Sequence, residues 1–180
     1  GGTGDDNVYY KNYNATSWTD AAVDLDGGAG SSSDISADLD GQPNNESIHI
    51  AFKNSTDSDV SYCKLAVTRS AANTISSIGS CTLFDIDTYD NTARPSLIIA
   101  NKGEGAGKEK VAIAWASNPL SGGTKQGEIR FLQCDVADGC DVAAEWKNAS
   151  EANSGTMPSA AETRVSADFI ELHTGRYANA

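Results

Sequence analysis

Apolar and polar residues alternate in short runs along much of the chain. Runs of this kind are "ESIHIAFKN" (46–54), "DVSYCKLAV" (59–67), "EKVAIAWAS" (109–117) and "GEIRFLQCDV" (127–136). Segments rich in Gly, Ser, Asn and Asp separate the runs, such as "NKGEGAGKE" (101–109). Alternation with a period of two is typical of strands that bury one face, and the intervening residue types favour turns. The pattern therefore predicts an all-β fold of antiparallel strands.

The predicted strands form a unit of four that occurs twice. In the first unit they are "ISADL" (35–39), "IHIAF" (48–52), "VSYCKL" (60–65) and "CTLFDI" (81–86). In the second unit they are "SLIIA" (96–100), "VAIAW" (111–115), "IRFLQC" (129–134) and "AAEWKN" (143–148). Residues 141–152 also carry the best helix pattern of the chain, so a short helix and an outer strand anchored by Trp146 are both open there.

Sequence similarity between segments supports this division. "SDISADL" (33–39) resembles "TRVSADF" (163–169), and "RPSLIIA" (94–100) has the equivalent place between them, at offsets of about 60 and 70 residues. We therefore predict a single all-β repeat domain over residues 1–180. Its parts are the end of one unit (1–30), two complete units (31–92 and 93–155) and the start of a further unit (156–180).

On this division the chain begins and stops within a unit. One interpretation is that it is cut from a longer protein. The other is that copies complete one another, with the N-terminal strands of one copy joining the C-terminal strands of the next. The expected partners are accordingly copies of the same chain or the remainder of a longer one.

The units are similar to the blades of a β-propeller, because they combine four antiparallel strands, a period near 60 residues and aromatic outer strands. The sequence pattern "PSLIIA…KVAIAW…GEIRFLQC" resembles that of sialidase-like propellers of the BNR type, and the resemblance covers nearly the whole chain. The Asp-box of that family, S-x-D-x-G-x-x-W, is absent, since "SSSDISADLDG" (31–41) lacks the Trp. The resemblance implies a partial propeller, and the alternative is a β-sandwich of similar strands.

Charge narrows the set of partners. The chain has 13 Lys and Arg against 25 Asp and Glu, which gives a net charge of −12. Nucleic acids and anionic membranes attract cationic surfaces, so this charge argues against both. No apolar run approaches the ~20 residues that cross a bilayer, so membrane insertion is not expected either.

Cysteines and sequons indicate an oxidising, secretory route. The four cysteines have sequence-local spacings that favour the pairs Cys63–Cys81 and Cys134–Cys140, although four cysteines allow three pairings. Four N-x-S/T sequons are candidates for glycosylation: Asn14, Asn45, Asn54 and Asn148. Together these features predict a secreted or cell-surface protein.

The turn after residue 37 is a calcium candidate. In "DLDGQPNNE" (38–46), oxygen-bearing side chains occur at the spacing of the calcium loop of integrin-type FG-GAP repeats, D-x-D-G-D-G-x-x-D, which the segment resembles: Asp38, Asp40, Gln42 and Glu46. Gln stands where that loop has an Asp, and a proline replaces a glycine. The alternative is a turn between strands whose acids are solvated. No other cofactor is expected.

No catalytic constellation stands out. A sialidase-type site needs several arginines, a Tyr–Glu pair and an acid/base Asp, and "ARPSL" at Arg94 lacks most of the F-R-I-P motif. His49 and His173 lie near no nucleophile elbow. His49 alternates with Ile48 and Ile50, so we expect it to face away from the core.

Aromatic residues supply the remaining candidates for binding. We expect Trp115 to pack in the core and one of the adjacent Tyr9 and Tyr10 to face outward, where it could stack on a sugar ring. The predicted function is therefore a non-catalytic extracellular module for adhesion, glycan binding or self-assembly, for example into a filament. The alternative is a fragment of a sialidase-like glycoside hydrolase.

Overall fold

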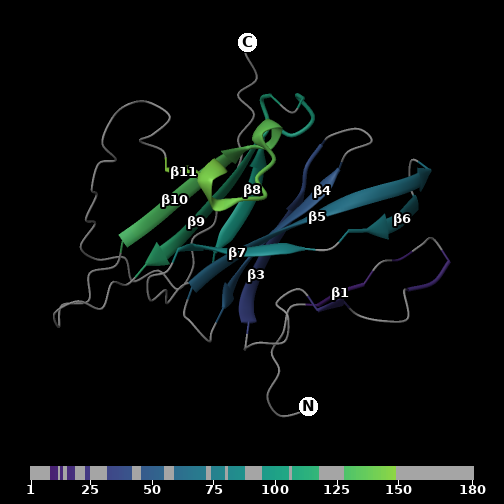
Figure 1. Ribbon diagram of the computed structural model, residues 1–180, viewed down its shortest axis with the longest axis horizontal. Coiled ribbons are helices and arrows are strands. Elements are labelled where there is room, and N and C mark those ends of the chain that lie inside the picture. Colours follow the sequence, from purple (N-terminus) through teal and green to yellow (C-terminus); the bar gives the residue numbers. More distant parts are fainter. Residues whose placement is uncertain are drawn as a thin grey trace, which may run out of the picture.

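The structure is a computed structural model (Figure 1). It describes residues 9–11, 13, 16–18, 23–24, 32–41, 46–54, 59–71, 74–79, 81–87, 95–105, 107–117 and 128–148.

The first complete unit is one antiparallel sheet. Its strands are β3 (Ser32–Leu39), β4 (Ser47–Asn54), β5 (Asp59–Ala71), β6 (Thr74–Ile78) and β7 (Thr82–Asp87). They follow the order β3-β4-β5-β6, and β7 also pairs with β5. β5 is long enough, at 13 residues, to hold β7 along its first half and β6 along its second half. The four predicted strands are therefore confirmed, and the β5–β6 hairpin is an addition that the sequence did not predict.

The second complete unit is a separate antiparallel sheet. Its strands are β8 (Ser96–Ala100), β9 (Lys110–Ser117), β10 (Glu128–Asp135) and β11 (Lys147–Asn148), in the order β11-β10-β9-β8. Two single-turn 3-10 helices, η1 (Val136–Asp138) and η2 (Ala143–Glu145), lie between β10 and β11. Residues 141–148 therefore combine the single-turn helix η2 with a two-residue outer strand, so each of the two open alternatives describes part of the segment.

A short N-terminal hairpin joins β1 (Tyr9–Tyr10) to β2 (Val23–Asp24) in antiparallel pairing. The described residues thus form antiparallel β-structure whose only helices are η1 and η2, and the all-β prediction is confirmed. Neither of these helices has the length and apolar character of a membrane-crossing helix. The assignment of the two meanders to propeller blades stays a prediction.

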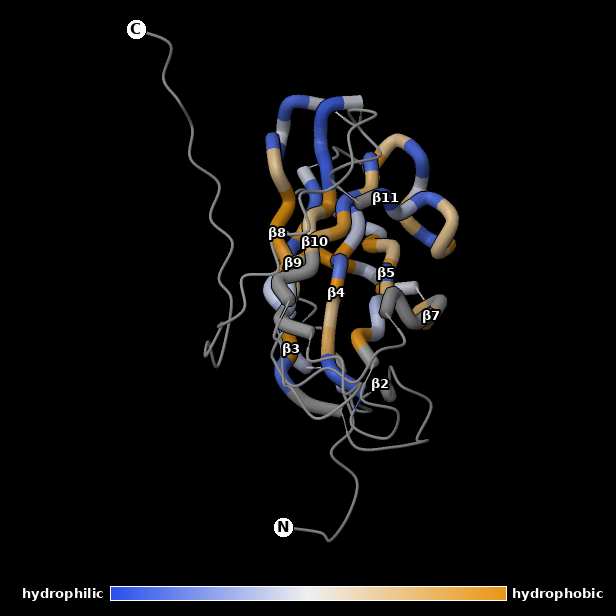
Figure 2. Tube along the Cα trace, turned by 90° about the vertical axis from the view of Figure 1, so that its left-hand side faces the viewer, coloured by the Kyte–Doolittle hydropathy of each residue, from blue (hydrophilic) through white to orange (hydrophobic). Residues whose placement is uncertain are grey.

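The two sheets share a core. The shared cluster takes Ala51, Val60 and Tyr62 from the first sheet and Leu97, Ile113, Trp115 and Trp146, among others, from the second. Alternate residues of β4 and β5 form a second cluster on the other face: Ile50, Phe52, Cys63 and Leu65. The first sheet is therefore buried on both faces of its middle strands, and Trp115 lies in the core as expected. Figure 2 shows apolar residues along these strands and hydrophilic residues in the turns at one end.

Both predicted disulfides are present. Cys63 of β5 is bonded to Cys81 just before β7, and Cys134 of β10 is bonded to Cys140 after η1. The linked residues are 18 and 6 positions apart. In the chain-entropy account, closing loops of this length stabilises a fold by about 2 to 3 kcal/mol each. The bonds tie an outer strand and an outer turn to their sheets, and they indicate an oxidising environment such as the extracellular space.

Candidate functional site

The first strands of the two units, β3 and β8, lie side by side (Figure 1). β8 is the outer strand of its sheet, so one row of its backbone N–H groups faces no strand of that sheet. The N–H of Leu97 donates to Ser36 Oγ at 2.9 Å, and the N–H of Ile99 donates to Asp38 Oδ2 at 3.0 Å. Residues two apart in a strand face the same side, so a Ser-x-Asp pair on β3 caps the edge of β8.

The second oxygen of Asp38 is also engaged. Asp38 Oδ1 accepts from Lys102 Nζ at 2.6 Å and from the N–H of Leu39 at 2.8 Å. Partial burial works to raise the pKa of this carboxyl, but the hydrogen bonds from Lys102, Ile99 and Leu39 outweigh it and lower the pKa. Asp38 is therefore ionised at neutral pH and strengthens the junction as a charged acceptor.

The turns that follow β3 and β8 meet at a buried carboxylate. Glu109 is fully buried, and its side chain accepts from the N–H of Gly41 at 3.3 Å and from the N–H of Gly103. A Cβ on Gly41 would lie only 2.5 Å from Gly103 N. The turn of the first unit therefore needs glycine at position 41, because the backbone of the second unit approaches there so closely.

A second buried polar cluster, the Asp40–His49–Tyr62 cluster, lies within the first unit. His49 Nδ1 is 2.5 Å from Tyr62 Oη, and His49 Nε2 is 3.3 Å from Asp40 Oδ2. Asp40 Oδ1 also accepts from the N–H of Ser47 at 2.9 Å. Trp146 of the second unit packs edge-on against Tyr62, with ring centroids 4.6 Å apart. The cluster therefore fixes the β3–β4 turn and supports the contact between the sheets.

Burial determines the protonation of this cluster. Desolvation lowers the pKa of His49, despite the opposing effect of Asp40, and desolvation raises the pKa of Tyr62. With His49 neutral, Nε2–H donates to Asp40 and Nδ1 accepts from the Tyr62 hydroxyl, so the His49–Asp40 contact is a hydrogen bond rather than an ion pair. All three residues are at most 2% exposed, which favours a structural role.

Two expectations drawn from the sequence are wrong here. His49 does not face away from the core, because both faces of β4 are covered. Asp40 is not a solvated turn residue, because the β3–β4 turn folds its carboxylate inward onto Ser47 and His49.

The structure does not bring the calcium candidates together. Asp38 faces β8, Asp40 points inward, and Glu46 bonds to Arg69. Gln42 lies outside the described residues. Within the described ranges there is no group of three or more His, Cys, Asp or Glu side chains that could hold a metal ion. Calcium binding stays a hypothesis, and it would require these carboxylates to change partners.

The remaining candidates are two sequons within the described residues and four residues outside them. Of the sequons, Asn54 ends β4 and is half-buried, and Asn148 ends β11. Asn14, Asn45, Arg94 and His173 fall outside the described residues.

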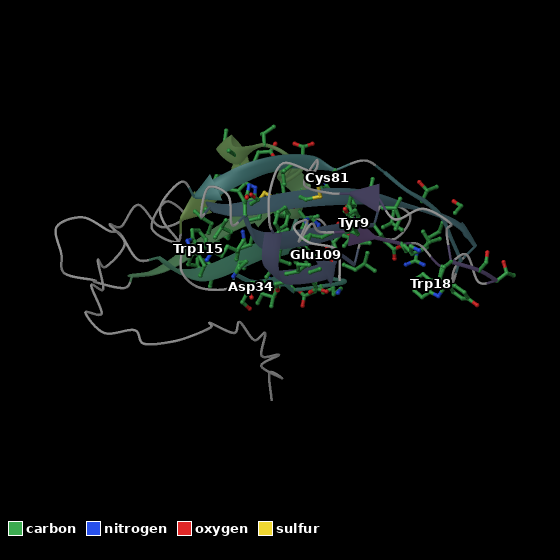
Figure 3. The ribbon with its side chains drawn as sticks, turned by 90° about the horizontal axis from the view of Figure 1, so that it is seen from below. Tyr9, Trp18, Asp34, Cys81, Glu109 and Trp115 are labelled. Atoms are coloured by element: carbon green, nitrogen blue, oxygen red, sulfur yellow. A yellow bond between two sulfur atoms is a disulfide. The ribbon has the colours of Figure 1, made fainter. Side chains whose placement is uncertain are left out.

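The N-terminal hairpin presents exposed aromatic residues. Tyr9, Tyr13 and Trp18 are each at least half exposed, in line with the expectation that one of Tyr9 and Tyr10 faces outward. The rings of Tyr13 and Trp18 lie 5.4 Å apart at an angle of 53°. Figure 3 shows Trp18 near one end of the molecule, far from the buried Trp115.

Comparison with family models, with curated proteins and with solved structures found no match to this chain. Sequence reasoning missed the role of Ser36 and Asp38 at the junction. The available signal was the recurrence of "SAD" at 36–38 and 166–168.

Proposed function

We propose that this chain is a non-catalytic extracellular repeat module that assembles, unit beside unit, into a larger structure such as a filament. The observation that carries the proposal is the β3–β8 junction, in which a Ser-x-Asp pair on one first strand caps the backbone of the next first strand. Both bonds span 61 residues, close to the period of the repeat. Ser166 and Asp168 have the same spacing, so a contact of this kind can recur at a further unit, whereas β8 has Ile98 at the position of Asp38.

The two disulfides support an extracellular setting for this assembly. The meander units and the contact between their first strands also suit an arc of sialidase-like propeller blades, which is the architecture we propose for the assembled units. In this proposal the buried Asp40–His49–Tyr62 cluster and Glu109 stabilise the fold. The edge strands of the sheets and the N-terminal hairpin bind the partners.

Assembly is tested by sedimentation velocity of the oxidised chain over a range of concentrations, combined with negative-stain electron microscopy. We expect species larger than one chain whose amount rises with concentration. A single species with the mass of one chain at every concentration would contradict the proposal.

Glycan binding is a second candidate, favoured by the exposed Tyr13–Trp18 pair. Aromatic faces stack on the apolar faces of pyranose rings, and an anionic chain suits neutral glycans better than acidic ones. We expect binding to an array of neutral glycans to fall about tenfold in Trp18→Ala and to be unchanged in Val142→Ala, which removes another exposed apolar side chain. Equal binding by both variants would exclude this pair as a glycan platform.

The glycoside hydrolase alternative has a direct test. A fluorogenic sialoside and a panel of fluorogenic glycosides should remain unhydrolysed by the purified chain. The non-catalytic assignment would be overturned by turnover that is lost when Tyr62, another tyrosine or a carboxylate residue is mutated.

A further inference from the structure

The outer edge of β3 corresponds to the edge of β8 that Ser36 and Asp38 cap. Both are the first and outermost strands of their sheets. Ala37 and Leu39 hold the positions in β3 that Leu97 and Ile99 hold in β8. Matching cross-strand pairs show this correspondence: Ala37–Ile50 and Leu39–Ile48 in the first sheet, Leu97–Ile113 and Ile99–Val111 in the second.

Burial distinguishes the two edges. In β8, Leu97 and Ile99 are at most 4% exposed, because the first unit covers them. In β3, the counterpart Ala37 is exposed and the counterpart Leu39 is half-buried, and the nearby Ile35 is 56% exposed. The side of β3 that corresponds to the covered side of β8 therefore presents apolar side chains to solvent. An exposed strand edge with apolar neighbours is a ready template for another strand.

The backbone of β3 offers the matching donors. The N–H of Leu39 donates to the side chain of Asp38 rather than to β4, so it points to the outer side of the strand. Alternate residues of a strand direct their N–H groups to the same side, which places the N–H of Ala37 on that side too. In β8 the two corresponding N–H groups are those that the Ser-x-Asp pair caps.

A second segment of the chain carries the same Ser-x-Asp pair between apolar residues. "VSADF" (165–169) repeats "ISADL" (35–39), with Ser166 and Asp168 at the spacing of Ser36 and Asp38 and an apolar residue on each side. We propose that residues 165–169 of one copy cap the β3 edge of a second copy, with Ser166 accepting from the N–H of Ala37 and Asp168 replacing Asp38 Oδ1 as the acceptor for the N–H of Leu39. This inference names the contact by which the proposed assembly forms, and so it rests on the proposed function.

The order of the units selects a second copy as the partner. At the junction seen within the chain, the Ser-x-Asp pair acts on a strand 61 residues later. β3 precedes residues 165–169 in the sequence, so a contact with β3 of the same copy would reverse this order, whereas β3 of a second copy offers the same edge without that reversal. The two surfaces differ, so the contact is heterologous and continues into a ring or an open filament.

The experiment uses the full oxidised chain and sedimentation velocity. The pair variant, Ser166→Ala with Asp168→Asn, removes the acceptors. The edge variant, Ala37→Pro, removes one outer N–H, and proline is tolerated on an edge strand where the N–H does not serve the sheet. The control, Ser159→Ala with Glu162→Gln, makes the same chemical changes a few residues before the segment. We expect self-association to weaken about tenfold or more in the pair and edge variants, as for loss of a charge-assisted hydrogen bond, and to stay at the wild-type level in the control.

Mixing the two variants gives the sharper result. Each retains one intact surface, so an equimolar mixture should form heterodimers that do not grow further, whereas each variant alone should associate at least about tenfold more weakly than the wild type. Circular dichroism and intact disulfides confirm that both variants are folded. Wild-type association by both variants overturns this inference and leaves the proposed assembly standing. A monomeric wild-type chain overturns both. Loss of thermal stability in the pair variant without any change in association overturns the second copy as partner and assigns the contact to the same chain.

Discussion

At the scale of single residues, Gly41 marks the closest approach between the turns of the two units. A Cβ there would lie 2.5 Å from Gly103 N and 2.8 Å from Glu109 Oε1. We expect Gly41→Ala to lower the free energy of unfolding by about 1 to 3 kcal/mol, as overpacking of a filled site does. Urea denaturation measures the change. Gly107→Ala is the control, because nothing lies within 4 Å of the added Cβ, and a loss as large as that in Gly41→Ala would refute the steric explanation.

At the same scale, His49 makes the stability of the fold depend on pH. Burial lowers the pKa of folded His49 below its ordinary value of 6.5, with Asp40 opposing and Lys64 assisting the shift. Below pH 6.5 the unfolded chain therefore binds a proton that the folded chain does not, and stability falls with decreasing pH by at most about 1.4 kcal/mol per pH unit from this residue. Above pH 6.5 the full contribution of neutral His49 to the free energy of unfolding is present.

His49→Gln tests this dependence, because it removes the titrating ring. The measurement is the free energy of unfolding from pH 7.5 down to the acid limit of the fold. We expect the variant to be less stable at neutral pH and to show a smaller slope below pH 6.5 than the wild type. His173 is present in both proteins, so its titration cancels in the comparison. Equal slopes would show that His49 does not carry the acid sensitivity.

At the scale of elements, the β3–β8 junction predicts local protection of the β8 backbone. The N–H of Leu97 is bonded to Ser36 Oγ, so Ser36→Ala should speed hydrogen exchange of the Leu97 amide and cost about 1 kcal/mol of stability. Ser76→Ala is the matched control, because its hydroxyl bonds to Thr68 O at the exposed β5–β6 hairpin. Unchanged exchange at Leu97 in Ser36→Ala would mean that the hydroxyl does not protect the edge.

The elements also show what the sequence can predict. Strands with regular alternation, such as β4 and β9, and the local disulfides followed from residue patterns, because those patterns reflect local geometry. The direction in which His49 points could not be predicted in this way. Because β4 is covered on both faces, alternation along it no longer separates core positions from solvent positions. The β5–β6 hairpin was missed because "TISSI" (74–78) is short and largely polar. The capping role of Ser36 and Asp38 depends on a strand 61 residues away, which no local pattern reveals.

At the scale of the whole molecule, a net charge of −12 opposes the approach of identical copies. Raising the ionic strength from about 10 mM to about 150 mM shortens the Debye length from about 30 Å to about 8 Å, which screens this repulsion. We therefore expect assembly to strengthen with NaCl, as followed by sedimentation velocity. Assembly that weakens with salt would mean that attractive ion pairs dominate the contact.

CaCl₂ at equal ionic strength is the informative comparison. A much larger effect of CaCl₂ than of NaCl on assembly would indicate specific calcium binding, with Asp38, Asp40 and Glu46 as the first residues to mutate. Equal effects would leave simple screening as the sole action of the cation.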